Sequence, residues 1–592
     1  MSPPVSFLPK WGAWYQADGT TRFRIWAPHY EQISVVLEDG SEMAMSKDEE
    51  GWHETCFSCQ PGVRYSYKLS PDTLIPDPAS QFQPDDVHEK SAVVDQHAYQ
   101  WRTPQWLGRP WEETVIYELH VGTCGGYSAI IKQLDALSDL GITAIELMPL
   151  SEFPGSRNWG YDGVFPYAPE SSYGSPNDLK ALIDAAHVRH IMVFLDVVYN
   201  HFGPEGNVLS QYIPEFFSSD RQTAWGQAIN FTLPAVQDFF LDNALYWLNI
   251  YHIDGLRLDA VHAIAPQSWL QDLVHQIRAR CHPERHIHFI LENENNDASL
   301  LRAGYSAQWN DDAHNALHVL LTGETEGYYG NFGQNPTQDL VLALQEGFVY
   351  QGQISPDTQK PRGQPSADLS PTSFIFFLQN HDQIGNRAVG DRLSTQIDSA
   401  VLSVAHALLL LSPHIPMLFM GEEWGTKTPF LYFVSHSDDL NRLVREGRQK
   451  EMAAFSAFNS QEKAHLIPDP ASPETFRRSC LDWAERNQPE YAEIYETVKK
   501  LIAVRQEHIV PRLRNARAAS SHIWAPGAFA VSWRMGDDRL LELFVNFSDT
   551  DITMLTGYAG VVLYRSDHQD RKINHTLKSH SFIATLREGS ER

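Results

Sequence analysis

The pattern of apolar and polar positions changes twice along the chain. In residues 1–100, apolar and polar residues alternate between turn signals, as in TRFRIWAP and QISVVLEDGS. Alternation with a period of two is typical of half-buried strands, so this region predicts an N-terminal β-sandwich. After about residue 505 the alternation returns, as in LLELFVNFS, without a helical stretch, and predicts a C-terminal β-domain over residues 505–592.

Between these two regions, in residues 101–504, short apolar runs alternate with helix-like segments. The runs are 115–123, 142–150, 191–201, 253–262, 286–295, 306–312, 373–382 and 416–425. Of these, 306–312 (SAQWNDD) is weak. Eight strands with intervening helices predict an α/β fold, a closed (β/α)₈ TIM barrel.

Polar residues gather where the predicted barrel strands end. Asn200, Asp259, Glu292, Asp382 and Glu422 each stand at or near the C-terminal end of a different run. In a (β/α)₈ barrel the active site forms at this end of the strands. An open, doubly wound sheet would also place its site there, but no Gly-rich phosphate loop follows any run, which argues against a nucleotide site.

Three further segments stand out within the predicted barrel. Residues 202–235 are long for a connection and contain Gly, Pro and aromatic residues, so we expect a small lid over the barrel mouth. Residues 352–372 are rich in Pro and Ser and are expected to form a surface loop. The run VLSVAHALLLL (401–411) is too short to span a bilayer and predicts a core helix.

The charge balance restricts the kind of partner. Lys and Arg total 46 and Asp and Glu total 74, which gives a formal net charge of −28 spread along the chain. Such a field repels phosphate backbones and anionic lipid, so we expect neither nucleic acid nor membrane as a partner. The aromatic content of 11%, with 16 Trp, suits a neutral partner with flat apolar faces, such as a sugar. The sequence makes no prediction of oligomeric state.

The cysteines and the N-terminal residues favour a cytoplasmic location. Five cysteines is an odd number for a disulfide framework. Cys56 and Cys59 form a CxxC without a second pair or a His cluster, so we expect no metal site there. The first residues, MSPPVSFLPKWG, lack a basic region followed by an apolar core and do not predict a signal peptide.

The acids at the strand ends suggest glycoside hydrolysis. That reaction needs a carboxylate and a protonated acid on either side of an oxocarbenium-like transition state. Asp259, Glu292 and Asp382 could supply this set, with Arg257 keeping Asp259 ionised and burial after FIL raising the pKa of Glu292. The alternatives are a structural ion pair for Arg257 and Asp259, a solvated strand end for Glu292 and a helix cap for Asp382.

Four segments resemble the ordered motifs of the α-amylase-type glycoside hydrolases. They are DVVYNH (196–201), GLRLDAVH (255–262), ILEN (290–293) and FLQNHD (377–382). The resemblance implies that Asp259 is the nucleophile, that Glu292 is the acid and base, and that Asp382 fixes the distorted sugar. It also implies a retaining mechanism, and we expect no cofactor and no metal.

The same resemblance assigns supporting roles around these acids. Asp196 and Asn200 would give structural support, and Tyr161 would stack on the sugar in the cleavage subsite. The other residues that the resemblance places in contact with substrate are His201, Arg257, His262, Asp311, Asp312, His314, His381, Gln383 and Asn386. For the polar ones among these, ordinary hydrogen bonding at the barrel rim is the alternative.

Further segments are similar to the trehalose-releasing members of that family. These are VIYELHVGT, PDPASQFQPDDVH, WNDDAHNALHVLLTGE and LFMGEEWGTKTPFLYFVSH. The similarity implies cleavage of the α-1,4-glucosidic bond beside the terminal trehalose of malto-oligosyltrehalose, with release of trehalose. Ala313 and Asn315 depart from the expected pattern, where a larger apolar residue and a His are usual.

Three alternatives stay open at this point. Glu294, two residues after Glu292, is a rival for the role of the acid. A glycogen-branching or debranching enzyme would share the four motifs and the N-terminal domain. A glucan-binding protein without activity is a third possibility, although the complete set of acids argues against it because a binder needs no buried proton donor.

Overall fold

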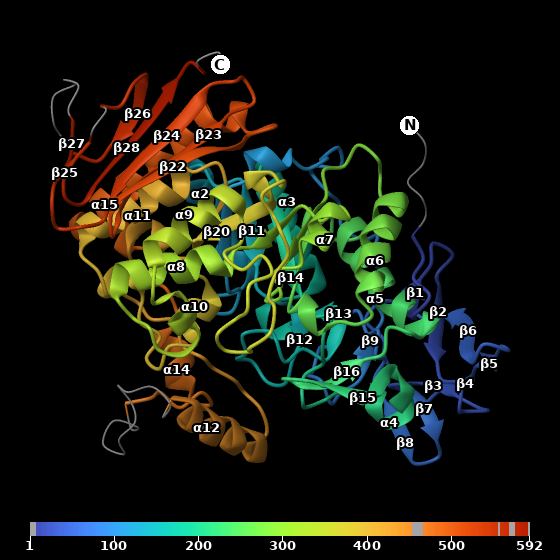
Figure 1. Cartoon of the computed structure of the whole chain (residues 1–592). Coiled ribbons are helices and arrows are strands. Elements are labelled where there is room, and N and C mark those ends of the chain that lie inside the picture. The colour runs from blue at the N-terminus through green and yellow to red at the C-terminus, as the bar shows by residue number, and fades with distance from the viewer. Residues whose placement is uncertain (1–6, 453–465, 555–556, 568–574, 590–592) are drawn as a thin grey trace.

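The structure is a computed structural model that describes residues 7–452, 466–554, 557–567 and 575–589. A closed barrel of parallel strands lies at the centre, and helices surround it. The N-terminal sheets (blue) lie on one side of the barrel and the C-terminal sheet (red) lies on another (Figure 1). The predicted fold class is confirmed by this architecture.

Two antiparallel sheets form the N-terminal part, in the orders β1-β2-β6-β5 and β4-β3-β7-β8, with β9 paired to β7. Their strands are β1 (Gly12–Tyr15), β2 (Thr20–Trp26), β3 (Ser34–Leu37), β4 (Glu42–Ala44), β5 (Ser46–Lys47), β6 (Trp52–Ser58), β7 (Arg64–Ser70), β8 (Thr73–Ile75) and β9 (Ser91–Ala92). Alternate residues of β2 are buried, as a half-buried strand requires. The domain boundary near residue 100 stays a prediction.

Eight strands close the barrel in sequence order, each parallel to its neighbours, with β21 returning to β10. They are β10 (Ile116–Leu119), β11 (Ala144–Leu147), β14 (Met192–Val197), β17 (Gly255–Leu258), β18 (His288–Leu291), β19 (Ala307–Trp309), β20 (Phe374–Phe377) and β21 (Ile415–Phe419). The first seven lie within one predicted run each, and β21 begins one residue before the run at 416–425. The weak run at 306–312 therefore does supply the sixth barrel strand.

Most helices surround the barrel, and others, such as α12, lie away from it (Figure 1). Among the described residues they are α1 (Tyr127–Ile131), α2 (Leu134–Leu140), α3 (Pro176–Val188), α4 (Leu209–Tyr212), α5 (Pro234–Asn249), α6 (Gln267–Arg280), α7 (Ala298–Arg302), α8 (Asp311–Thr322), α9 (Pro336–Glu346), α10 (His381–Gly385), α11 (Ser399–Leu411), α12 (Asp438–Met452), α14 (Pro473–Arg478) and α15 (Pro489–Val504). The buried helix α11 confirms the core helix predicted at 401–411. None of the described helices is long and apolar enough to cross a membrane.

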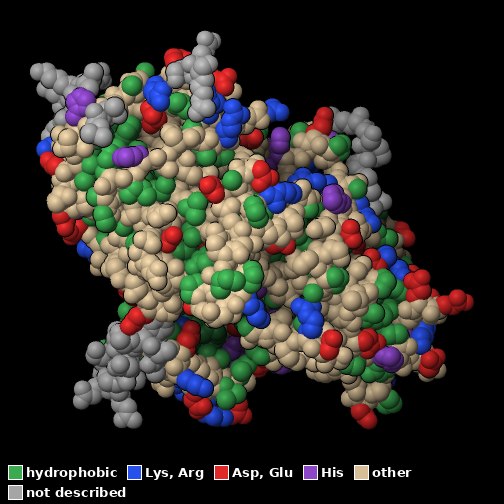
Figure 2. Space-filling view, viewed as in Figure 1, with side chains coloured by type: hydrophobic (Ala, Val, Ile, Leu, Met, Phe, Trp, Pro, Cys, Tyr) green, Lys and Arg blue, Asp and Glu red, His purple; other side chains and the backbone are tan. Residues whose placement is uncertain are grey.

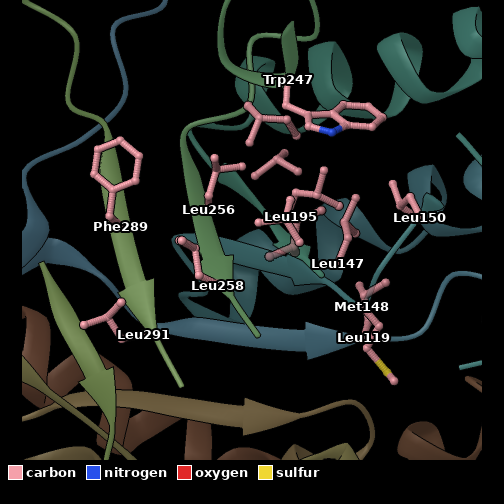
Figure 3. Packing of buried hydrophobic residues seen from close by; sticks show 14 of the residues in the cluster. Leu119, Leu147, Met148, Leu150, Leu195, Trp247, Leu256, Leu258, Phe289 and Leu291 are labelled. Carbon is pink, nitrogen blue, oxygen red and sulfur yellow. The ribbon is translucent and has the colours of Figure 1, made fainter. Parts of the chain in front are cut away.

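Successive side chains of each barrel strand point alternately to the outside and to the inside of the barrel. Leu147, Leu195 and Leu256 occupy the outer face and belong to one apolar cluster with Trp247 of α5 (Figure 3). The residues next to each of these leucines along its strand point inward, because successive side chains of a strand lie on opposite faces. A second cluster fills the interior and consists of Ile116, Ala144, Met192, Phe194, Ile290, Ala307, Trp309, Ile375, Phe377, Ile415 and Met417. The polar residues of the inner face therefore lie at the C-terminal end of the barrel, next to this apolar layer.

The connections after the strands hold three small structures. Residues 202–235 contain α4 and a hairpin of β15 (Phe217–Thr223) and β16 (Gly226–Ile229). Another hairpin, β12 (Ser151–Glu152) with β13 (Phe165–Pro169), was not expected from the sequence. The expected surface loop at 352–372 holds one isolated bridge, between Ile354 and Pro361.

The C-terminal part is an antiparallel sheet in the order β22-β23-β24-β28-β26, with β25 and β27 forming a separate pair. Its strands are β22 (Arg517–Ala525), β23 (Ala528–Arg534), β24 (Leu540–Asn546), β25 (Ile552–Thr553), β26 (Val561–Arg565), β27 (Thr576–Leu577) and β28 (Ser581–Arg587). The expectation of no helix after residue 505 was wrong locally, since Arg505–Ile509 forms a π-helical turn and Val510–Arg512 a 3₁₀ turn. The buried Arg505 fixes this turn by donating to the carbonyls of Leu410, Ser412 and His414.

Charged side chains of both signs are interspersed over the face shown in Figure 2. Acidic side chains are therefore not gathered in a single patch on this face. A field of this kind acts on association and solubility more than on the fold.

Candidate active site

The Arg257 side chain joins three carboxyl groups at the C-terminal end of the barrel. Its Nη1 donates to both carboxylate oxygens of Asp196, at 2.9 and 2.8 Å, and to Asp259 Oδ1 at 2.8 Å. Its Nη2 donates to Glu292 Oε2 at 2.8 Å. The side chain is fully buried, and its guanidinium lies 4.1 Å from the ring centroid of Trp309. Burial alone would lower the pKa of Arg257, but the surrounding carboxylates hold it above its ordinary value.

Asp259 follows β17 and is held from two sides. Besides Arg257, the Asn200 side chain donates from Nδ2 to Asp259 Oδ2 at 2.7 Å and to the Asp259 carbonyl at 3.0 Å. The Asp259 side chain is 11% exposed. One carboxylate oxygen therefore faces the guanidinium and the other faces an amide, which fixes the plane of the carboxylate.

Glu292 follows β18 and lies beside Asp259. Its Oε2 accepts from Arg257 and also from the backbone N–H of Ala260 at 2.9 Å. Ala260 adopts a left-handed conformation with φ of 41°, which is unusual for a residue with a Cβ and turns its N–H toward the carboxyl group. Burial raises the pKa of Glu292, and the charge of Asp259 raises it further, against the opposing effect of Arg257. The shift favours the protonated acid.

Asp382 lies in α10, just after β20, and remains accessible, with 38% of its side chain exposed. The side chain that caps α10 is Asn380, which accepts from the Gln383 N–H, so Asp382 is free of the capping role considered above. Its Oδ1 accepts from Asn386 Nδ2 at 3.1 Å and lies 3.6 Å from His381 Nε2.

His381 and Tyr161 form one wall of the site. Their rings are stacked, with centroids 5.1 Å apart and an interplanar angle of 26°. Tyr161 also donates to Asp196 Oδ2 at 2.6 Å. Burial raises the pKa of Asp196 to about 7, against the lowering effect of Arg257. Asp196 thus links the aromatic wall to the guanidinium.

His201 contacts the backbone of Tyr161 and the side chain of Asn200. Its Nε2 lies 3.0 Å from the Tyr161 carbonyl and its Nδ1 lies 2.5 Å from Asn200 Oδ1. The indole of Trp225, half-exposed at the tip of the β15–β16 hairpin, stacks on His201 with centroids 5.5 Å apart. The segment 202–235 therefore does reach the residues around the barrel mouth.

The positions of Glu292 and Glu294 differ strongly. Glu294 is 76% exposed, and its carboxylate lies 3.6 Å from His262 Nε2. The Glu294 backbone N–H lies 3.4 Å from His262 Nδ1. Glu292 contacts the buried guanidinium, whereas Glu294 faces solvent, so the structure favours Glu292 as the acid.

Asp311 and Asp312 begin α8 but face different surroundings. Burial raises the pKa of Asp311 well above its usual range, and the charges of Glu292, Asp312 and Asp382 raise it further. Asp312 is fully buried and accepts from Arg362 Nη2 at 2.9 Å. Its other donors are Asn296 Nδ2 and the backbone N–H groups of Val349 and Tyr350. Asp312 thus anchors the loop that carries Arg362, and its position does not support a substrate contact.

The remaining predicted contacts lie near α10. The His314 ring is buried and stacks on Phe377, with centroids 5.3 Å apart, and burial lowers its pKa to about 3. Gln383 Oε1 accepts from the hydroxyls of Tyr328 at 3.1 Å and Tyr329 at 3.4 Å. His314 is thus a neutral packed ring, while Gln383 lies next to the half-exposed Tyr328.

Several residues of the site were not predicted. Glu118 of β10 contacts His381, Trp309 of β19 lies over Arg257, and Arg362 pairs with Asp312. Each stands in a segment that the sequence analysis recognised, but nothing in its local pattern marked it. Among the described residues, no group of three or more His, Cys, Asp or Glu side chains is arranged to hold a metal ion.

Comparison with known proteins adds to this geometry. Residues 105–225 match the family model for the α-amylase catalytic domain, and residues 516–583 match a domain of unknown function, DUF3459. A malto-oligosyltrehalose trehalohydrolase of Saccharolobus solfataricus is 39% identical over 524 residues, which cover 86% of this chain and 89% of the relative. One of Arthrobacter ramosus is 40% identical, over 82% of this chain and 87% of the relative.

The chain belongs to the malto-oligosyltrehalose trehalohydrolase family. It is therefore a glycosidase of the α-amylase type, as the four motifs implied. A crystal structure described as a putative α-amylase from Salmonella typhimurium has 43% sequence identity and a TM-score of 0.93, and covers 98% of this chain and 100% of that one. A 1,4-alpha-glucan branching enzyme of Pseudoalteromonas atlantica is 32% identical, but only over 41% of this chain and 38% of the relative.

Proposed function

We propose that the protein hydrolyses the α-1,4-glucosidic bond beside the terminal trehalose of malto-oligosyltrehalose and releases trehalose. The observation that carries the proposal is the single guanidinium of Arg257, which holds Asp259 on one nitrogen and Glu292 on the other. A glycosidase needs a carboxylate and a protonated acid on either side of the bond that it cleaves. The names of the relatives supply the substrate.

In the first step, Asp259 attacks the anomeric carbon while Glu292 gives its proton to the departing oxygen. Arg257 and Asn200 each donate to one oxygen of the Asp259 carboxyl group, which orients it for the attack. The raised pKa of Glu292 favours its protonated form. The bond between glucan and trehalose breaks, trehalose leaves, and the glucan stays bound to Asp259 as an ester.

In the second step, Glu292 acts as the base. It takes a proton from a water molecule, which attacks the anomeric carbon of the glucosyl ester and releases the glucan from Asp259. Two inversions at one carbon leave the configuration unchanged, so the free glucan end is first formed as the α-anomer. Asp382, whose side chain is accessible, would bind the hydroxyls of the distorted sugar.

An assay with matched substrates tests the proposal. The protein is incubated with malto-oligosyltrehalose and, separately, with the same malto-oligosaccharide carrying a free reducing end. We expect trehalose from the first substrate and much slower turnover of the second. Equal turnover of both substrates would contradict the specificity for the trehalose end.

The rival activity in the same family is glucan branching. Incubation with linear and branched glucan measures it through new or lost α-1,6 linkages. The branching enzyme relative matches less than half of this chain, whereas the trehalohydrolases match more than four-fifths, which supports the hydrolase. New α-1,6 linkages without trehalose release would favour the branching activity instead.

We also propose a cytoplasmic location. All five cysteines are free thiols in the structure, at Cys56, Cys59, Cys124, Cys281 and Cys480. Free thiols are typical of proteins in reducing compartments. Fractionation of the source cells tests this, and recovery of the protein outside the cytoplasmic fraction would contradict it.

A further inference from the structure

Two carboxyl groups that the proposed reaction does not use lie on neighbouring barrel strands next to the site. Glu118 of β10 and Glu146 of β11 are paired in register, and each residue is 1% exposed. Both point into the barrel, because they alternate with the outward-facing Leu119 and Leu147. Equal burial and equal register make them a natural pair for comparison.

Glu118 makes two contacts with His381. Its Oε1 lies 2.5 Å from His381 Nδ1, and its Oε2 accepts from the His381 backbone N–H at 3.1 Å. Both side chains are almost fully buried, at 2% exposure for His381 and 1% for Glu118. One carboxyl group thus fixes both the ring and the first backbone N–H of α10, which also carries Asp382.

The rest of the His381 ring is equally confined. Its Nε2 lies 3.6 Å from Asp382 Oδ1, on the side away from Glu118. Tyr161 stacks on the ring, and Trp159 meets it edge to face with centroids 5.5 Å apart. A ring with a carboxylate near each nitrogen satisfies both of them only when both nitrogens carry a proton.

We propose that Glu118 is a positioning residue that holds His381 as a doubly protonated imidazolium and directs its Nε2–H toward Asp382 and the sugar in the cleavage subsite. The inference rests on the proposed function for the identity of that sugar. Glu118 does not touch substrate and acts only through His381. A cation at this place would oppose the build-up of negative charge among the surrounding carboxyl groups and hold Asp382 in its accessible position.

The charged and titratable groups that face His381 come from several elements. They are Glu118 of β10, Glu146 of β11, Asp196 of β14, Arg257 of β17, Asp382 of α10 and His120 after β10. Burial by itself lowers the pKa of His381, but Glu118 and Asp382 overcome this effect and that of Arg257 and raise the pKa to about 9. His120 stays neutral, since burial lowers its pKa to about 4.

Glu146 provides the matched control. Neither of its carboxyl oxygens has a hydrogen-bond partner among the described residues. Burial raises the pKa of Glu146 well above its usual range, and the charge of Glu118 raises it further. Burial without a partner thus favours the protonated, neutral form of Glu146, so a neutral amide is the matched replacement.

The experiment compares Glu118→Gln with Glu146→Gln in the full-length protein. Histidine is labelled with ¹³C at Cε1, and the His381 signal is assigned by its loss in His381→Gln. In the unchanged protein and in Glu146→Gln we expect His381 to titrate near pH 9. In Glu118→Gln we expect it to titrate at or below the ordinary histidine value of about 6.5.

Kinetics give a second readout that a merely structural role would not move. We expect kcat/KM for trehalose release to fall about tenfold or more in Glu118→Gln at pH 7.5, and much less in Glu146→Gln. The deficit of Glu118→Gln should shrink toward pH 5, because acid restores the imidazolium. A deficit that is the same at both pH values would overturn the proposal.

The outcomes separate this inference from the proposed function. A neutral His381 at pH 7 in the unchanged protein overturns the inference even if Glu118→Gln fails to fold. An equal shift of His381 in both Gln variants overturns it as well. Absence of trehalose release from the unchanged protein would contradict the proposed function, while the His381 titration would still report on Glu118.

Discussion

The side chain of Asn200 binds Asp259 twice, through its carboxylate at 2.7 Å and its backbone carbonyl at 3.0 Å. Asn200 follows β14 and Asp259 follows β17, so the contact joins the ends of two neighbouring strands at the barrel rim. The carbonyl contact fixes the backbone of Asp259, and the other contact fixes its carboxylate.

This relationship predicts that Asn200→Ala lowers kcat for trehalose release by about 10- to 100-fold, the value of one hydrogen bond to a charged group. Asn200→Asp should be worse, because a second carboxylate would face Asp259 at hydrogen-bond distance. Steady-state kinetics on malto-oligosyltrehalose measure both variants. An Asn200→Ala protein with unchanged kcat would show that the contact has no role in the reaction.

Much of this arrangement could be predicted from the sequence because it depends on local pattern. Asp259 and Glu292 end recognisable strands, and the closed barrel brings strand ends together. Even Ala307–Trp309, with three residues, lies inside the weak run predicted at 306–312.

The parts that could not be predicted depend on contacts between distant segments. Glu118 is one polar residue in an apolar strand, a pattern that by itself indicates no function. Only the closed barrel brings it to His381, which lies 263 residues later in the chain. Arg362 stands in a Pro- and Ser-rich stretch, yet it pairs with the buried Asp312. The helices α12 and α14, which follow the last barrel strand, were not anticipated, because that stretch matches no part of the βα pattern.

Glu292 and Glu294 allow a direct test of the acid. Glu292→Gln should lower kcat by about 10²–10⁴-fold, since it removes general acid and base catalysis. Glu294→Gln should change kcat by less than about threefold, because the carboxylate is 76% exposed and its nearest charged partner is His262 at 3.6 Å. The reverse ranking in a trehalose-release assay would move the acid to Glu294.

The pH dependence follows from the raised pKa of Glu292. The protonated form is the active acid, so kcat/KM falls as the pH rises through that pKa. With an α-maltosyl fluoride substrate, whose leaving group needs little protonation, this fall should disappear or move toward the His381 pKa of about 9. Identical alkaline limbs for both substrates would contradict the assignment of the acid.

Replacing Asp311 and replacing Asp312 should change the free energy of unfolding by very different amounts. Asp312→Asn removes the charge that pairs with the buried side of Arg362 and should lower the free energy of unfolding by about 3–5 kcal/mol. Asp311→Asn should change it by less than about 1 kcal/mol, because the raised pKa of Asp311 favours the neutral carboxyl group, which the amide resembles. Denaturant unfolding followed by circular dichroism compares the two, and equal losses would contradict this distinction.

The central claim is that Asp259 forms a bond to the anomeric carbon while Glu292 supplies and later removes the proton. Proton NMR of the first glucan product, recorded before its free end mutarotates, tests this claim most directly. The account predicts that the new reducing end appears as the α-anomer. A β-anomer as the first product would contradict it, since water would then have displaced trehalose in a single step.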